Sequence, residues 1–414
     1  MSRERLLERF LKYVQIDTTA GQPGGKYPSS DGQLVLGKVL ADELIKMGVV
    51  DATQDEHGLV YGTVQGTVMG CPVVALNSHV DTSPETTGAN VKPQVIEKYA
   101  GGDIPLPGDP SKVITVRENP ELKDLHDCTL VTSDGTTLLG GDDKAGIAVI
   151  MEVAQRILEG KGPDIGTLKI LFTCDEEIGH GVDHVDFQKL GADVCYTLDG
   201  PGANELNEET FSADLATVIV KGVNIHPSIA KGRMVNAVRA AAALVAKLPT
   251  DRLSPETTDE RDGFIHPYIV EGGVEETTVQ CILRSFETDG LESQAQLIRD
   301  LAKQVEGEFP GCEISVVVTA QYRNLRDGLE KEPRAVPIAE NAHSALGRPC
   351  HKRVIRGGTD GSRLTEMGLP TPNLSTGQHN PHSPLEWACL DEMEQAVELV
   401  LKMLELWAGE AKTF

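Results

Sequence analysis

The chain has 414 residues, of which 40% are hydrophobic and 24% charged, a composition typical of a soluble globular protein with two or three domains. Asp and Glu number 63 against 38 Lys and Arg, and the net charge of −25 argues against a nucleic acid or an anionic membrane as partner. No segment is long and apolar enough to span a bilayer, and the charged stretch Met1–Val14 lacks the apolar core of a secretory signal.

The eight cysteines are scattered along the chain, and none forms a Cys-x-x-Cys pair. A disulfide framework or a thiolate zinc site would cluster them. We therefore expect reduced, mostly buried cysteines in a protein of the cytoplasm.

The N-terminal half is predicted to alternate between helices and strands. Apolar residues at helical spacing predict helices over 4–15, 33–47 and 145–159. Short runs of apolar and β-branched residues predict strands over 59–64, 73–76, 167–173 and 194–198. This alternation predicts an α/β fold, with a central mixed β-sheet flanked by helices.

Residues 83–134 interrupt the alternation with six prolines and little periodicity. So long an irregular stretch inside a compact domain is usually functional, for example as a lid over a site.

The pattern changes between residues 208 and 320. The predicted order there is strand, helix, strand, strand, helix and strand, over 217–221, 235–248, 266–271, 277–284, 291–308 and 313–318. This is the order of an α+β ferredoxin-like domain. The alternation then resumes with a helix over 335–346, a loop over 356–362, a strand over 371–374 and a helix over 390–407. We expect a small domain, residues 208–320, inserted into a larger one formed by residues 1–207 and 321–414.

The first polar segment follows the strand predicted over 73–76. His79 and Asp81 would point to the same side of an extended chain. The second ring nitrogen of a metal-binding histidine is usually held by a carboxylate or a carbonyl, and Asp81 could hold His79 in this way. Taken alone, a chance His-x-Asp in a surface loop is the simpler interpretation.

The second polar segment, Asp142 and Asp143, opens the helix predicted over 145–159. The helix dipole favours acidic residues there, so a simple N-terminal role is an equal alternative for Asp143. A phosphate loop is a poor interpretation, because two acids would repel a phosphate.

Acidic residues and histidines also follow three later strands. Glu176 and Glu177 follow the strand over 167–173, and carboxylates in such a place are costly unless water or a cation satisfies them. Asp199 comes after the next strand, where a turn-forming role is an alternative. His379 and His382 come after the strand over 371–374, and for His379 an ordinary loop role is preferred.

Nearly all of these segments would lie at the carboxyl ends of strands, where open α/β sheets form their sites. Histidines combined with carboxylates make a donor set suited to zinc. A spare glutamate beside such ligands could serve as a general base.

The segments Ser78–Asp81, Gly140–Gly146, Asp175–Gly179 and Asp199–Gly200, followed by a late histidine, resemble the two-zinc aminoacylase/carboxypeptidase family of metallopeptidases. Further similar stretches, at 91–97, 132–140, 224–237 and 356–361, extend the likeness over essentially the whole chain. The most similar branch removes the N-terminal residue from tripeptides. The resemblance implies a zinc-peptidase domain with an inserted lid domain, two zinc ions per subunit and short peptides as substrates, and it allows a homodimer.

The resemblance also implies a metal ligand set. His79 and Asp199 would bind one zinc ion, Glu177 and His382 would bind the other, and Asp142 would bridge the two.

Further roles implied by the resemblance concern catalysis and substrate binding. Glu176 would be the general base and Asp81 would orient His79. The candidates for substrate binding are His226, Asn236, Arg284 and Arg356. Each has a structural alternative: a solvent-facing turn for the histidine, a helix cap for the asparagine and an ion pair for either arginine.

Two alternatives for the function remain. A carboxypeptidase, a dipeptidase or an N-acyl amino-acid deacylase would use the same two-zinc scaffold, and the stretch over 83–134 would select against them by limiting peptide length. A non-catalytic small-molecule binding protein should have lost a ligand or the base, yet all five ligand positions and Glu176 are present.

Overall fold

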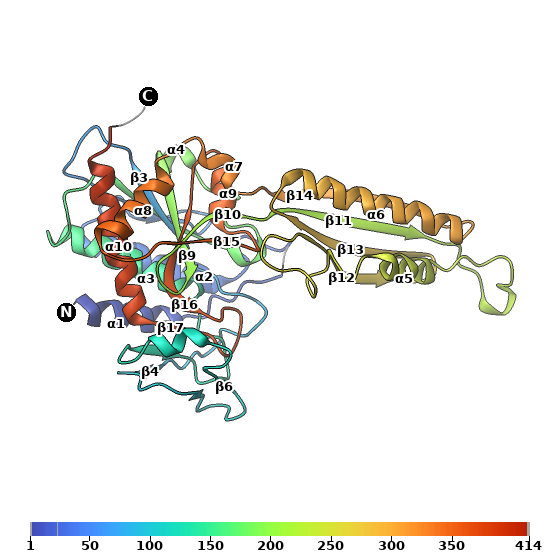
Figure 1. The fold of residues 1–414 in the computed structure, drawn as a ribbon, viewed down its shortest axis with the longest axis horizontal. Helices are drawn as coiled ribbons and strands as arrows, with labels where there is room; N and C mark the ends of the chain where they lie inside the picture. Colours follow the sequence, from blue (N-terminus) through green and yellow to red (C-terminus); the bar gives the residue numbers. More distant parts are fainter. Residues whose placement is uncertain (1, 23, 412–414) are drawn as a thin grey trace. The chain divides into compact units, whose positions relative to one another are not determined.

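The computed structural model describes residues 2–22 and 24–411, which fall into two compact units (Figure 1). The first unit comprises Met1–Glu208, Gly328–Arg353 and Thr359–Phe414, and the second comprises Glu209–Asp327 and Val354–Gly358. The inserted domain expected over 208–320 lies within the second unit apart from its first residue. That unit also takes residues 321–327 and 354–358, which the sequence analysis assigned to the larger domain.

An 11-stranded mixed sheet forms the centre of the first unit. Its main path runs β1-β2-β8-β3-β9-β16-β17-β7-β4, and β10 pairs with β16 and β15 beside it. The central strands are β8 (Leu168–Thr173), β3 (Val74–His79), β9 (Val194–Pro201) and β16 (Asn373–His379). These four are mutually parallel, so their carboxyl ends lie along one edge. The outer strands are β1 (Thr53–Gln54), β2 (Val60–Val64), β4 (Gln94–Ile96), β7 (Leu130–Thr132), β10 (Glu205–Thr210), β15 (His351–Ile355) and β17 (Trp387–Cys389).

Helices cover this sheet through one large hydrophobic core. The helix α3 (Gly141–Leu158) packs on β3, β9 and β16, and its residues from Ala145 to Ala154 are all buried, as expected for a helix that is apolar on every side. Two amphipathic helices, α1 (Ser2–Val14) and α10 (Leu390–Ala408), pack on α3 with their apolar faces inward. The other helices of this unit are α2 (Asp31–Met47), α4 (Phe187–Leu190), α8 (Ala335–Ala345) and α9 (Asp360–Glu366), and α7 (Arg326–Leu329) lies at its boundary.

The proline-rich stretch over 83–134 is packed rather than irregular throughout. Its strands β7 and β4 extend the central sheet next to β17, and β5 (Ile104–Pro105) pairs with β6 (Val113–Ile114). It also contains a 3-10 turn, η1 (Pro120–Asp124), and a small core of its own. Trp387 and Cys389 of β17 belong to that core, which fixes the stretch to the sheet.

The second unit is an antiparallel sheet of four strands covered by two helices. The strand order is β12-β13-β11-β14, and every neighbouring pair is antiparallel. Alternate residues of β11 are buried against α5 and α6, as the two-residue repeat of a strand requires. Its elements are β11 (Ser212–Lys221), α5 (Ala237–Lys247), β12 (Phe264–Gly272), β13 (Glu276–Ser285), α6 (Thr288–Glu308) and β14 (Glu313–Tyr322).

The predicted fold class is confirmed: the first unit has a mixed sheet flanked by helices, and the second is α+β with the strand and helix order of a ferredoxin-like domain. Several boundaries were wrong, among them the start of β11 at Ser212 and the ends of β3 at His79 and β9 at Pro201. The strand expected over 371–374 continues to His379, and α9 begins inside the loop expected over 356–362. No helix within residues 2–22 and 24–411 combines the length and the apolar character needed to cross a membrane.

Candidate metal centre

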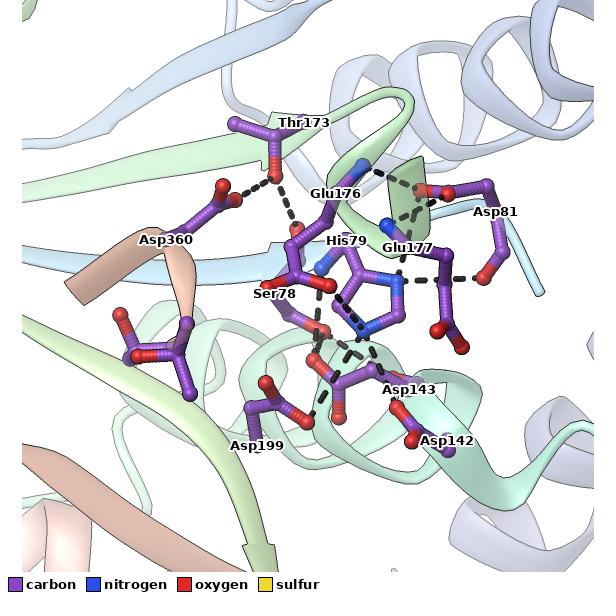
Figure 2. A network of polar contacts seen from close by, with 12 residues as sticks. Ser78, His79, Asp81, Asp142, Asp143, Thr173, Glu176, Glu177, Asp199 and Asp360 are labelled. Atoms are coloured by element: carbon purple, nitrogen blue, oxygen red, sulfur yellow. Dashed lines mark hydrogen bonds and ion pairs between the residues drawn. The ribbon is translucent and has the colours of Figure 1, made fainter. Parts of the chain in front are cut away.

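The predicted metal ligands converge at the carboxyl edge of the parallel strands (Figure 2). His79 is the last residue of β3, and Asp199 lies near the end of β9. Glu177 lies in the 3-10 turn η2 (Glu176–Ile178) that follows β8. Asp142 belongs to the first turn of α3, and His382 follows β16. Four of these residues meet because each ends or follows one of the parallel strands, and Asp142 joins them from the first turn of α3.

Asp142 lies between the two histidines, with a different carboxylate oxygen near each. His79 Nε2 is 3.0 Å from Asp142 Oδ1, and His382 Nε2 is 3.5 Å from Asp142 Oδ2. Asp199 Oδ1 lies 3.8 Å from His79 Nε2, and Glu177 Oε2 lies 2.9 Å from His382 Nε2. The five side chains thus form two groups of three that share Asp142.

The Nδ1 side of the His79 ring contacts Asp81. Its Nδ1 lies 3.1 Å from the carbonyl oxygen of Asp81 and 3.4 Å from Oδ1 of the same residue. A hydrogen on Nδ1 leaves the Nε2 lone pair directed at Asp142 and Asp199, the arrangement found in metal-binding histidines.

The carboxylate of Asp81 accepts hydrogen bonds from the turn η2. Its Oδ1 accepts the backbone N–H of Glu176 at 3.1 Å, and its Oδ2 accepts that of Glu177 at 3.0 Å. Asp81 therefore orients His79 chiefly through its carbonyl and fixes both glutamates through its side chain.

Burial and neighbouring charges shift the pKa values of the acidic side chains at the centre. Burial and the charge of Asp142 raise the pKa of Glu177 to about 7 and that of Asp199 to about 6, against the opposing effect of the histidines. Burial raises the pKa of Glu176 well above its ordinary range. For Asp142, burial acts upward, but His382 and His79 outweigh it and leave the pKa below its ordinary value.

The donor set fits divalent cations. His79, Asp142 and Glu177 offer one ligand atom each within 4.8 Å of one another, and so do His79, Asp143 and Asp199. Glu177 Oε1 and Asp143 Oδ1 are buried without a hydrogen-bond partner. Buried carboxylate oxygens are normally paired, and a cation would satisfy them. Two imidazoles with several carboxylates match the ligand preferences of zinc.

Asp143 is the residue at this centre that the sequence analysis left undecided. Its Oδ2 accepts from the hydroxyl of Ser78 and, at 3.3 Å, from the backbone N–H of His79. Burial, followed by the charge of Asp199, raises its pKa well above the ordinary value. The start of α3 lies close to β9 because residue 146 is a glycine: a Cβ atom at Gly146 would lie 2.0 Å from the carbonyl oxygen of Leu198.

Asp360, at the start of α9, is a buried carboxylate that the sequence analysis missed. The hydroxyl of Thr173 donates to its Oδ2 (Figure 2). The side-chain amide of Asn77 lies 3.5 Å from the same atom. Burial raises the pKa of Asp360 to about 6. This network ties β8 to β3 directly beneath the centre, but nothing in the local sequence around Asp360 marks it as close to those strands.

His379 lies outside the ligand group. Its ring stacks on Trp387 with centroids 3.7 Å apart, and its Nε2 lies 2.7 Å from Glu392 Oε2. The structure therefore brings His382, and not His379, to Glu177 and Asp142.

Two of the predicted substrate-binding residues lie in turns of the second unit. His226 is exposed, and its Nδ1 lies 2.7 Å from the hydroxyl of Ser228. Asn236 is the N-cap of α5, where its side chain accepts the backbone N–H of Arg239 at 3.3 Å. The capping role that competed for Asn236 is thus present.

Arg284 and Arg356 also belong to the second unit. Arg356 Nη1 donates to the carbonyl oxygens of Glu260 and Asp262, at 3.0 and 2.8 Å. Arg284 Nη1 donates to the side chain of Gln321 at 3.1 Å. Among residues 2–22 and 24–411, neither arginine forms the ion pair that was its structural alternative, and Arg356 donates to backbone carbonyls instead.

A model of the peptidase family M20/M25/M40 matches residues 128–406. Peptidase T of Clostridium botulinum (strain 657 / Type Ba4) is 40% identical over 405 residues, which cover 98% of this chain and 99% of the relative.

Solved structures share the fold. A tripeptidase from Staphylococcus aureus and aminopeptidase PepT from Bacillus cereus superpose with TM-scores of 0.77 and 0.75, each at 24% identity and with 99% of both chains covered. A dinuclear metal-binding peptidase of the M20 family from Bacillus subtilis gives a TM-score of 0.66 at 13% identity, covering 99% of this chain and 98% of its own.

Proposed function

The chain belongs to peptidase family M20/M25/M40, and from this premise we propose that it is a metallo-aminopeptidase that removes the N-terminal residue from tripeptides. The names of its relatives support this assignment: peptidase T at 40% identity, and an aminopeptidase and a tripeptidase among the solved structures. The observation that carries the proposal is the shared position of Asp142, with one oxygen beside each histidine.

The proposed cofactor is a pair of divalent cations, zinc in the first instance. His79 and Asp199 would hold one, Glu177 and His382 the other, and Asp142 would touch both. The dinuclear peptidase from Bacillus subtilis supports two ions in this fold. When bound, the pair supplies a Lewis acid for the scissile carbonyl and lowers the pKa of the attacking water.

Glu176 is the proposed general base. Its carboxylate is not among the ligands, and its Oε2 lies 4.0 Å from His79 Nε2, at the margin of the ligand group. A raised pKa suits a carboxylate that must both take and return a proton. Glu176 would take a proton from the attacking water at a carboxylate oxygen and pass it to the nitrogen of the departing amine. The hydrogen bonds from its backbone and from that of Glu177 to Asp81 hold the loop in place for this transfer.

The acidic surroundings of the centre suit the free ammonium group of a peptide. The packed stretch over 83–134 contributes to the same region, because the hydroxyl of Thr86 donates to the carbonyl oxygen of His382 at 2.8 Å. We propose that this stretch limits the length of the peptide. Substrate contacts by His226, Asn236, Arg284 and Arg356 stay predictions.

A peptide series tests the proposal. Di-, tri- and tetrapeptides of one composition, with free and with acetylated N-termini, would be incubated with zinc-, cobalt- or manganese-loaded protein. We expect the free tripeptide to be cleaved with the highest kcat/KM and the acetylated forms to resist. Turnover of acetylated substrates without turnover of free tripeptides would instead assign a deacylase.

The cytoplasm is the proposed location. All eight cysteines are free, six of them buried and two partly buried, which suits a reducing compartment.

A further inference from the structure

Within the described part of the chain, Glu386 is a buried carboxylate whose hydrogen bonds come from backbone N–H groups at the start of α3 and in the loop before it. The residue is 1% exposed. Its Oε2 accepts from the N–H of Leu139 at 2.8 Å and of Gly140 at 2.7 Å, and its Oε1 accepts from the N–H of Asp142 at 2.9 Å. Both oxygens therefore accept hydrogen bonds from the backbone segment that carries Asp142.

The fit between Glu386 and this loop is close. A Cβ atom at Gly141 would lie only 3.2 Å from Glu386 Oε1, so a side chain there would crowd the carboxylate. Gly140 has a φ of 81°, a left-handed conformation that glycine adopts without penalty. The two glycines thus let one stretch of backbone, from Leu139 to Asp142, present three N–H groups to one carboxylate.

Glu386 also belongs to the segment that carries His382. The chain between them turns tightly: His382 itself has a φ of 61°, and the N–H of Glu386 donates to the carbonyl oxygen of Ser383 at 3.0 Å. Glu386 therefore connects the backbone next to Asp142 to the segment that carries His382.

We propose that Glu386 is a positioning residue that fixes Asp142 between the two metal ions and couples its loop to His382, so that both ions bind tightly. The proposal rests on the proposed function, since it assumes that the centre binds metal. Glu386 itself is not placed in the ligand set, because both of its oxygens accept backbone N–H groups.

The test is metal binding, measured without turnover. Chelator-treated wild-type protein and the variants Glu386→Gln and Glu386→Asp would be titrated with zinc by calorimetry, and with cobalt by visible absorption. Glutamine keeps the size of the side chain but presents an amide NH₂, which cannot accept, to at least one of the three N–H donors. We expect Glu386→Gln to weaken zinc binding roughly 10- to 100-fold, the range found when partners of metal ligands are removed. Glu386→Asp should fall between Glu386→Gln and the wild type, with an altered cobalt spectrum.

Glu152→Gln is the matched control. Glu152 is also a fully buried glutamate of the first unit, on α3, but its carboxylate pairs with Arg5, Arg9 and Arg156 rather than with the ligand loop. We expect this variant to lower the melting temperature and leave zinc affinity and the cobalt spectrum unchanged.

The outcomes separate the two ideas. If the wild type binds no divalent metal, both the proposed function and this inference are wrong. If the wild type binds two equivalents of zinc and Glu386→Asp has the same zinc affinity and cobalt spectrum, only the role of Glu386 is overturned. This comparison holds even if Glu386→Gln does not fold. Equal losses of affinity in Glu386→Gln and Glu152→Gln would likewise overturn it, because they would indicate general destabilisation.

Discussion

At the scale of single residues, the centre is organised by carboxylates with different tasks. Asp142 lies between two histidine rings, Asp81 accepts two backbone N–H groups, and Glu386 accepts three. The residue types near strand ends were enough to predict the region of the ligands as a whole. They could not separate Asp142 from Asp143, because that difference depends on which way each side chain leaves the first turn of α3.

Glu176→Gln tests the proposed base. The variant keeps the size of the side chain but cannot accept a proton, so we expect kcat for tripeptides to fall roughly 10²- to 10⁴-fold. Metal content, measured by elemental analysis, should stay at the wild-type value. Loss of metal together with activity would mean that Glu176 is a ligand and that the base lies elsewhere.

Asp360→Asn tests the effect of the buried network on stability. Burial raises the folded-state pKa of Asp360 from 3.8 to about 6, so the folded protein holds this proton more tightly than the unfolded chain does. Its contribution to stability therefore decreases as pH rises from about 4 to about 6, by at most roughly 3 kcal/mol. In metal-free protein, we expect the urea midpoint of Asp360→Asn to improve relative to the wild type over this interval. A constant difference between the two proteins across the interval would contradict the assignment.

At the scale of elements, strand ends explain both the successes and the misses of the sequence analysis. The apolar parts of β3, β8 and β9 were predictable, but β3 continues through Ser78 and His79, which pair with Phe172 and Thr173 of β8. Polar residues at a strand end give no local signal of that pairing. The strand β15 escaped prediction for a related reason, because it begins with three exposed polar residues and lies beside the main path of the sheet.

Asn119 links the proline-rich stretch to the loop of His382. Its side-chain oxygen accepts from the amide of Asn380 at 2.6 Å and from the indole N–H of Trp387 at 3.2 Å, and the residue is buried. We expect Asn119→Ala to destabilise the protein by about 1–3 kcal/mol, because the buried indole N–H of Trp387 loses its acceptor and the amide of Asn380 loses one of its two. We also expect weaker zinc binding, since the loop of His382 loses its support.

Asn324→Ala is the control for this effect. Asn324 is an equally buried asparagine of the second unit, where its oxygen accepts the N–H groups of Thr210 and Arg326. Chemical denaturation and zinc titration of both variants provide the comparison. Equal zinc affinity in Asn119→Ala and Asn324→Ala would show that the stretch does not support the metal loop.

At the scale of the whole molecule, part of the excess of acidic residues is concentrated at the candidate metal centre. The net charge of −25 argues against anionic partners, and the structure gathers several of these carboxylates at one edge of the first unit's sheet. Within the described residues, every group of side chains that could hold a metal lies in this unit. The family resemblance read from the sequence motifs is confirmed, because the model of peptidase family M20/M25/M40 matches residues 128–406 and a relative is 40% identical over 405 residues.

Removal of the metal should destabilise the folded protein as a whole. An ion present at about 1,000 times its dissociation constant adds roughly 4 kcal/mol to the free energy of unfolding. We therefore expect chelation to lower the melting temperature in calorimetry, and added zinc to restore it. An unchanged melting temperature after verified metal removal would be at odds with a metal centre that bridges four strands.

The central claim is tested most directly by titrating metal-free protein with zinc while following cleavage of a free tripeptide and identifying the products. The account predicts no cleavage without metal, activity that is complete at two equivalents of zinc, and release of the N-terminal amino acid with a dipeptide. Cleavage by verified metal-free protein, or release of the C-terminal residue instead, would contradict it.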